Sequence, residues 1–226
     1  FTQLATGQIS KNMISTFWHG LNAIKSGSSR PQGIAPNQTQ KVGILGAGMM
    51  GAGIAYATAS KGITVVLKDV SIEHAEKGKA YSQKILDKQV SQGRISAERA
   101  AQVLANIHPT AQAADLQGCD LIIEAVFENP QLKAQVTQEA EVFLAEQGVM
   151  ASNTSTLPIS GLAQAAQDQQ RFIGLHFFSP VDKMPLVEII KGKNTSADTL
   201  AKAYDFVQHI GKTPIVVNDR RGFFTS

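Results

Sequence analysis

From Lys41 onward, short apolar runs alternate with longer stretches of mixed polarity. Residues 41–45 and 63–67 are apolar runs of strand length, and residues 49–61 between them, rich in Ala and Gly, predict a helix. Further strands are predicted at residues 121–126, 149–151, 172–178, 186–190 and 214–217, with helices in most of the gaps. Such alternation is typical of right-handed βαβ units. The pattern therefore predicts an α/β fold with a mostly parallel sheet and helices on both of its faces.

A long stretch with a polar face interrupts this alternation after the second strand. Residues 71–105 predict one or two long helices, broken near Gly93-Arg94. The stretch is longer than a simple crossover requires. We therefore expect a helical insertion that projects from the sheet.

The first 40 residues follow a different pattern. Residues 10–25 predict an amphipathic helix, with these apolar residues on one face: Met13, Ile14, Phe17, Trp18, Leu21 and Ile24. Residues 26–40 are rich in Gly, Ser, Pro and Asn and predict a loop. The helix either folds back onto its own domain or docks as a linker on another domain of a longer protein. The second interpretation is favoured, because a short helix with Phe and Trp lies outside the alternating pattern. We expect a linker helix and loop over residues 1–40 and one domain over residues 41–226.

Composition narrows the class of protein. Apolar residues make up 43% of the chain and charged residues 17%, which is the balance of a folded protein. The net charge of +3 is spread along the chain and forms no basic stripe for nucleic acid, and no apolar run reaches the ~20 residues of a membrane span. The single cysteine, Cys119, cannot form an internal disulfide. We expect the protein to be located in the bacterial cytoplasm, with the mitochondrial matrix as the alternative. Because the chain begins with Phe1 and stops just after Gly222-Phe223-Phe224, we also expect a piece of a longer protein.

A glycine-rich motif directly follows the first apolar run. Gly46, Gly48 and Gly51 form a G-x-G-x-x-G that opens the predicted helix, which suits a pyrophosphate resting on the free N–H groups of a helix N-terminus. Asp69 ends the second strand, 18 residues after Gly51, where a carboxylate can accept both ribose hydroxyls of an adenosine. No Arg follows Asp69, so NAD is favoured over NADP. The competing interpretation is a structural turn and a surface Asp. The motif predicts a Rossmann-type domain.

Candidate catalytic groups come from two later strands. Of the five histidines, none has metal-ligand spacing, and we expect no metal site. His176 lies near the carboxyl end of an apolar strand, and Glu188 is the charge inside residues 185–190. Asp182 lies midway between them, so an antiparallel pair turning there would set them opposite each other. The Glu would then orient the imidazole, leaving its other nitrogen to take a hydroxyl proton. The alternative is that His176 is a hydrogen-bonded core residue and that Glu188 lies at a sheet edge without any relation to it.

A run of small polar residues forms a third candidate. Residues 151–156 (ASNTST) directly follow the predicted strand 149–151. Hydroxyl and amide groups there can bind a substrate oxygen or a nicotinamide, and they equally suit a helix N-cap or a turn.

Together these motifs resemble the L-3-hydroxyacyl-CoA dehydrogenase family over residues 41–226. The matching pieces are GILGAGMMGAGIA, the strand ending in Asp69, IIEAVFENPQLK, ASNTST, GLHFFSP, PLVEII and the final GFF. Residues 9–33 are similar to the linker before this domain in multifunctional β-oxidation proteins, which carry an enoyl-CoA hydratase region upstream. The resemblance implies that a hydratase region and a C-terminal helical domain belong to the same parent chain, with a thiolase subunit as a further partner.

The resemblance also implies an activity, NAD-dependent oxidation of a (3S)-3-hydroxyacyl-CoA to the 3-oxoacyl-CoA in fatty-acid β-oxidation. His176 would be the general base, Glu188 its orienting partner, and Ser155 the group that holds the substrate oxygen. The cofactor would be lined by Gly46, Gly48, Met50, Gly51, Asp69, Val126, Phe127, Glu128, Lys133, Ser155 and Ser179, with Ser226 near the substrate.

Two departures from the family pattern weaken individual contacts. Ser179 and Ser226 stand where many relatives have Asn, and a hydroxyl is shorter and lacks the two donors of an amide. The helical C-terminal domain would begin where this chain stops, so we expect the chain to bind NAD and to be a poor catalyst alone. The alternatives are a β-hydroxyacid dehydrogenase acting on a free acid, which typically uses a Lys base, and a non-catalytic NAD-binding or structural protein.

Overall fold

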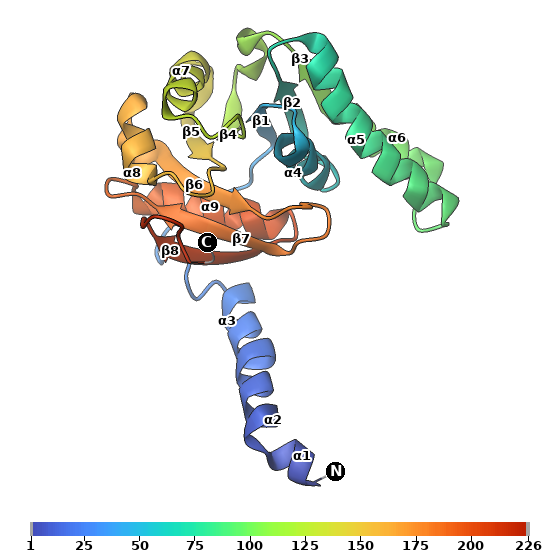
Figure 1. Ribbon diagram of the computed structural model, residues 1–226, viewed down its shortest axis with the longest axis vertical. Coiled ribbons are helices and arrows are strands. Elements are labelled where there is room, and N and C mark those ends of the chain that lie inside the picture. Colours follow the sequence, from blue (N-terminus) through green and yellow to red (C-terminus); the bar gives the residue numbers. More distant parts are fainter. Residues whose placement is uncertain (1, 225–226) are drawn as a thin grey trace.

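The computed structural model describes residues 2–224, and Figure 1 shows an α/β domain with a helical arm. One eight-stranded sheet has the order β3-β2-β1-β4-β5-β6-β7-β8. Neighbouring strands are parallel except β6 and β7, which are antiparallel. The predicted mostly parallel, Rossmann-type fold is confirmed. The strands are β1 (Lys41–Leu45), β2 (Thr64–Lys68), β3 (Ile107–Thr110), β4 (Cys119–Glu124), β5 (Leu144–Ser152), β6 (Phe172–Phe177), β7 (Leu186–Lys191) and β8 (Thr213–Asn218).

Helices cover both faces of the sheet, as the sequence predicts. One apolar cluster joins alternate strand residues such as Ile44 and Ile123 to α4 (Met49–Ala59), α5 (Ile72–Ser91), α6 (Ala97–Ala105) and α9 (Ala197–His209). The opposite cluster, which includes Ile122 and Met150, joins α7 (Pro130–Glu141) and α8 (Ile159–Leu162). Within the described residues, three 3-10 turns complete the domain: η2 (Ala113–Leu116), η3 (Ala163–Ala165) and η4 (Gln169–Arg171). Buried apolar side chains alternate along the central strands, so both faces of the sheet are core.

The predicted insertion after the second strand is confirmed as the pair α5 and α6. Ser71 and Ser96 cap their first turns, each accepting a hydrogen bond from the backbone three residues on. The chain turns between them at Gly93, whose φ is +65°. The pair extends away from the sheet in Figure 1.

Two strand details differ from the prediction. β3 was not predicted, because exposed His108 and half-buried Pro109 interrupt its apolar pattern, and it forms only through its pairing with β2 at the sheet edge. β5 begins at Leu144, five residues before the predicted start, and its pairing with β4 shifts register between Cys119 and Leu121. The polar residues of this first part, Glu146 and Gln147, are exposed, so this part carries no apolar strand signal.

The predicted N-terminal helix begins earlier than the sequence indicates and forms an arm. It comprises α1 (Thr2–Thr6), α2 (Gln8–Met13), a π-helical stretch η1 (Ile14–Gly20) and α3 (Leu21–Lys25), and none of these contains a buried residue. Figure 1 shows the arm leaving the domain next to β8 and α9. The backbone oxygen of Ile24 accepts a hydrogen bond of 2.7 Å from the Tyr204 hydroxyl of α9. The arm therefore contacts the domain at its last turn and does not fold back along the sheet.

Candidate active site

The glycine-rich motif forms a tight turn between β1 and α4 that fits a dinucleotide. Gly46 has a φ of +94°, which favours glycine, and its carbonyl oxygen would lie 1.8 Å from a Cβ on Gly51. Gly48 is the N-cap of α4, and nothing lies within 4 Å of a Cβ built on it. The open N-terminus of α4 thus leaves room for a pyrophosphate above its free N–H groups.

Asp69 is held beside this turn. Its carboxylate accepts hydrogen bonds from the backbone of Ala47 at 2.6 Å and of Val70 at 2.7 Å. The side chain keeps 18% of its surface exposed, and the Nδ1 atom of His74 lies 3.7 Å from Asp69 Oδ1. The carboxylate is therefore fixed at the end of β2 and still reachable by a ribose.

A buried charge network joins the carboxyl ends of β4 and β5. Glu124 is 1% exposed and accepts hydrogen bonds from Lys133 Nζ at 2.7 Å, the Ser152 hydroxyl at 2.7 Å and the Val126 backbone at 2.8 Å. Lys133, itself 2% exposed, also contacts Glu128 at 3.1 Å. Sequence reasoning missed Glu124, although its place at the end of an apolar strand was a signal of the kind that marked Glu188.

Glu128 connects this network to the predicted polar run. It accepts hydrogen bonds from the Thr154 hydroxyl at 2.5 Å and from the Ser155 backbone at 2.8 Å and hydroxyl at 3.3 Å. Burial by itself raises the pKa of Glu128, but these hydrogen bonds and the charge of Lys133 outweigh it and lower the pKa to about 2. The loop that carries Ser155 is therefore anchored on an ionised carboxylate.

The predicted strand pairing that brings His176 and Glu188 together is confirmed. β6 and β7 are antiparallel, with His176 opposite Glu188 in register. The imidazole Nδ1 and a Glu188 oxygen are 2.7 Å apart, and the two residues are 8% and 0% exposed. The other carboxylate oxygen accepts a hydrogen bond of 3.2 Å from the Phe224 backbone. The Phe178 ring lies 4.5 Å from the imidazole, centroid to centroid. His176 therefore has one ring nitrogen on a buried carboxylate and an aromatic neighbour that limits its rotation.

Asn153 ties the Ser155 loop to the His176 strand. Its side-chain oxygen accepts a hydrogen bond of 2.9 Å from the Phe177 backbone. Sequence reasoning did not single out Asn153, because nothing in the run distinguishes a cross-strand contact from an N-cap. The carboxyl ends of β4, β5 and β6 thus carry Glu128, Ser155 and His176 on one edge of the sheet, where open α/β sheets place their ligands.

The remaining predicted residues are distributed around this edge. Met50 is partly buried against the core, Phe127 is 86% exposed, and the exposed Ser179 places its hydroxyl 3.5 Å from the sulfur of Met49. Ser226 lies outside the described residues. Contact of these residues with a cofactor or substrate stays a prediction.

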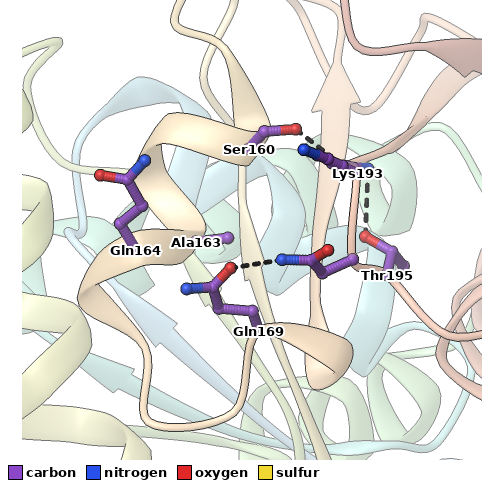
Figure 2. Close-up of a pocket in the computed structure, with 8 residues that line it drawn as sticks. Ser160, Ala163, Gln164, Gln169, Lys193 and Thr195 are labelled. Atoms are coloured by element: carbon purple, nitrogen blue, oxygen red, sulfur yellow. Dashed lines mark hydrogen bonds between the residues drawn. The ribbon is translucent and has the colours of Figure 1, made fainter.

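A separate cavity of about 350 Å³ lies away from this edge. It is formed by α8, the turns η3 and η4 and the loop after β7, and Figure 2 shows Ser160, Gln164, Gln169 and Lys193 around it. None of the predicted site residues that the structure describes lines it. Over residues 2–224, no helix is long and apolar enough to cross a membrane.

Comparison with known proteins identifies the family. Residues 41–220 match the family described as 3-hydroxyacyl-CoA dehydrogenase, NAD binding domain. The (S)-3-hydroxybutyryl-CoA dehydrogenase of Ralstonia eutropha is 38% identical with a TM-score of 0.81, over 83% of this chain and 66% of that protein. The 3-hydroxybutyryl-CoA dehydrogenase of Escherichia coli K12 is 31% identical with a TM-score of 0.79, over 82% of this chain and 39% of that one.

A third similar structure is the dehydrogenase part of multifunctional enzyme 1 from C. elegans. It is 26% identical with a TM-score of 0.73, over 88% of this chain and 48% of that one. The chain thus spans at most about two thirds of these three proteins. The glycine turn, the fixed Asp69 and the matched residues agree on the cofactor, which is NAD. The chain belongs to the 3-hydroxyacyl-CoA dehydrogenase family and carries its NAD-binding domain.

Proposed function

We propose that this chain takes part in the NAD-dependent oxidation of a (3S)-3-hydroxyacyl-CoA to the 3-oxoacyl-CoA. The observation that carries the proposal is the buried His176–Glu188 pair, with 2.7 Å between Nδ1 and the carboxylate, on the sheet edge that also holds the dinucleotide turn. NAD supplies a hydride acceptor when it is bound. The chain's own residues supply orientation and proton transfer.

His176 acts as the general base in this proposal. Glu188 accepts the hydrogen bond from Nδ1–H, so Nε2 carries the lone pair that takes the proton of the 3-hydroxyl. As that proton moves to Nε2, the C3–H bond breaks with its electron pair leaving as hydride, and a carbonyl forms at C3. The buried Glu188 carboxylate stabilises the imidazolium that results.

Ser155 positions the reacting oxygen in the same proposal. Its loop is anchored to Glu128 through the Thr154 hydroxyl and the Ser155 backbone, and to β6 through Asn153. A hydroxyl on a fixed loop can hold the substrate oxygen near His176, and such preorganisation lowers the entropic cost of reaching the reactive geometry.

We further propose the setting of this reaction. Residues 1–40 would serve as a linker to an enoyl-CoA hydratase region in a multifunctional β-oxidation protein. This proposal is supported by the exposed apolar arm and by the likeness to the dehydrogenase part of multifunctional enzyme 1. A helical domain after residue 226 would complete the acyl site, and a thiolase subunit would be a further partner. The bacterial cytoplasm is the proposed compartment, in keeping with a free, buried Cys119.

The test is reduction of acetoacetyl-CoA by a protein that contains this chain and the proposed helical domain, followed through NADH absorbance, with free 3-oxobutanoate as the competing substrate. We expect turnover of the CoA ester and much less of the free acid. His176→Ala should lower the rate by about 10²–10⁴-fold while NADH binding is kept. An unchanged rate in His176→Ala would contradict the mechanism. Equal rates on the free acid would favour a β-hydroxyacid dehydrogenase, and no turnover with intact NADH binding would favour a non-catalytic NAD-binding protein.

A further inference from the structure

A shallow recess with one charged end lies next to Asp69. It has a volume of about 50 Å³, and Val126, Val136 and Ala140 form apolar parts of its wall. Its charged end is an ion pair between Lys68 of β2 and Glu139 of α7, with Nζ 3.2 Å from the carboxylate. The Lys68 and Glu139 side chains are 15% and 45% exposed, so the lysine is largely enclosed and the carboxylate is accessible.

The course of NAD across the domain leads its adenine to this recess. Gly46 and Asp69 both line the recess. Because the pyrophosphate lies at the glycine turn and the adenosine ribose at Asp69, the base attached to that ribose reaches the recess that these two residues share. Apolar walls suit the faces of a flat base, but they offer nothing to its polar edge.

We propose that Glu139, with Lys68, recognises the amino edge of adenine and makes the site selective for the base of the cofactor. A carboxylate only accepts hydrogen bonds and an ammonium only donates them. Glu139 accepts from the exocyclic amine of adenine, and Lys68 donates to the neighbouring ring nitrogen. The inference rests on NAD as the cofactor and not on the acyl substrate proposed above.

Hypoxanthine reverses this pattern. It has a carbonyl oxygen where adenine has the amine, and an N–H where adenine has the unprotonated ring nitrogen. The carbonyl would face the Glu139 carboxylate, acceptor against acceptor, and the N–H would face the Lys68 ammonium. The site therefore disfavours hypoxanthine by leaving polar groups without partners. Since Glu139 is 45% exposed, water reduces this penalty, and the discrimination is moderate.

An ordinary surface ion pair between β2 and α7 would behave differently. Its loss would change stability slightly and would affect every dinucleotide alike. The ratio of affinities for two dinucleotides that differ only in the base is therefore the informative quantity, since a purely structural role does not change it.

The experiment is a calorimetric titration of the chain with NADH and with reduced nicotinamide hypoxanthine dinucleotide. We expect the native chain to bind NADH about five- to tenfold more tightly. Glu139→Gln should lower that ratio toward one, because a Gln amide can donate to the hypoxanthine carbonyl as well as accept from the adenine amine, while the Lys68 mismatch with the hypoxanthine N–H remains. The matched control is Glu146→Gln, which removes the same charge from an exposed position at the start of β5, and its ratio should stay at the native value.

Either of two results would overturn the inference. Equal affinity of the native chain for both dinucleotides would show that the base is not recognised at its amino edge. A ratio in Glu139→Gln that equals the native ratio would show that Glu139 is not the recognising residue. Both results leave the His176 mechanism untouched. Folding of each variant is checked by its unfolding transition, and Lys68→Met, which removes the donor, should also lower the ratio.

Discussion

The ionisation of Glu128 makes the stability of the fold depend on pH. Its pKa is lowered from 4.5 to about 2 in the folded chain, where Thr154, Ser155 and Lys133 stabilise the ionised form. A carboxyl group with a depressed folded pKa stabilises the fold above its unfolded pKa, and this stabilisation is lost as the pH falls toward the folded value. The relevant window is therefore between about pH 4.5 and pH 2.

We predict that Glu128→Gln lowers the free energy of unfolding at pH 7 by about 1 kcal/mol or less, because the side chain is 36% exposed and water screens its charge. The deficit relative to the native chain should shrink as the pH falls from 4.5 toward 2. Urea unfolding at a series of pH values measures this difference. A deficit that stays constant across that window would contradict the assignment of the stabilisation to the ionised carboxylate.

Lys133 presents the opposite situation, a cation buried among carboxylates. With 2% of the side chain exposed, its charge is compensated by Glu124 at 2.7 Å and Glu128 at 3.1 Å. We predict that Lys133→Met lowers the free energy of unfolding by about 3–5 kcal/mol, because it leaves the buried Glu124 without its cation. Urea unfolding provides the measurement. The double variant with Glu124→Gln should recover part of the loss, and strictly additive losses would mean that the pair does not act as a unit.

At the residue scale, the His176–Glu188 pair could be predicted from the positions of the two strands along the sequence. His176 and Glu188 are equally spaced from Asp182, so one antiparallel turn was enough to bring them together. The partners of Glu124 could not be predicted in the same way. Its partner Ser152 lies opposite it only because β4 and β5 are adjacent, and Lys133 reaches it only because α7 crosses over β4. Such contacts depend on the order of strands in the sheet, which the sequence pattern leaves open.

At the scale of elements, α4 must lie unusually close to the loop between β6 and β7. A Cβ on Gly53 would lie 2.9 Å from Val181 Cβ. The same loop is tied to α5 by a 3.0 Å hydrogen bond from Tyr81 to Asp182, and Lys212 donates to the Val181 carbonyl. The cofactor helix and the hairpin that carries His176 and Glu188 are therefore packed as one unit.

We predict that Gly53→Ala lowers the free energy of unfolding by about 1–2 kcal/mol, although Ala favours helices, because the added methyl overlaps Val181. The control is Gly161→Ala in α8, where nothing lies within 4 Å of the new Cβ. That variant should be neutral or slightly more stable, as helix propensity alone implies. Thermal unfolding compares the two. Equal behaviour of both variants would indicate that α4 moves away from the loop at little cost.

The elements themselves were predictable where apolar residues repeat regularly. β1, β2, β6 and β7 agree with the sequence pattern to within one or two residues. β3 was missed because a four-residue edge strand with exposed His108 buries too few side chains to leave a pattern. The direction of the helical arm could not be predicted either. An amphipathic pattern indicates that one face of the helix favours burial, but it does not identify the surface that buries it.

At the scale of the whole chain, the arm and the domain meet at a joint formed by the Ile24–Tyr204 hydrogen bond and by Arg30. Arg30 binds the Asp205 carboxylate of α9 through Nε at 2.6 Å and through a second nitrogen at 2.8 Å, and it also donates to backbone oxygens of Ile34 and Ala35. These contacts fold residues 30–37 against α9. Beyond the joint, the arm exposes large apolar side chains: Leu4, Ile9, Met13, Ile14, Phe17 and Trp18.

We predict that a change in the exposed arm and a change at the joint affect the stability of the domain differently. Removing residues 1–20 should leave the unfolding midpoint and NADH affinity of the domain unchanged, because residues 2–20 bury no side chain. Arg30→Ala should lower the free energy of unfolding by about 1–2 kcal/mol, since it leaves the Asp205 carboxylate, 12% exposed, without its bidentate partner. Urea unfolding of both variants makes the comparison. Marked destabilisation by the truncation would mean that the arm packs on the domain in solution, and then the linker role proposed for residues 1–40 would fail. A stable truncated domain, with the acrylamide quenching expected of an exposed Trp18 in the full chain, would leave the apolar face of the arm available to another domain.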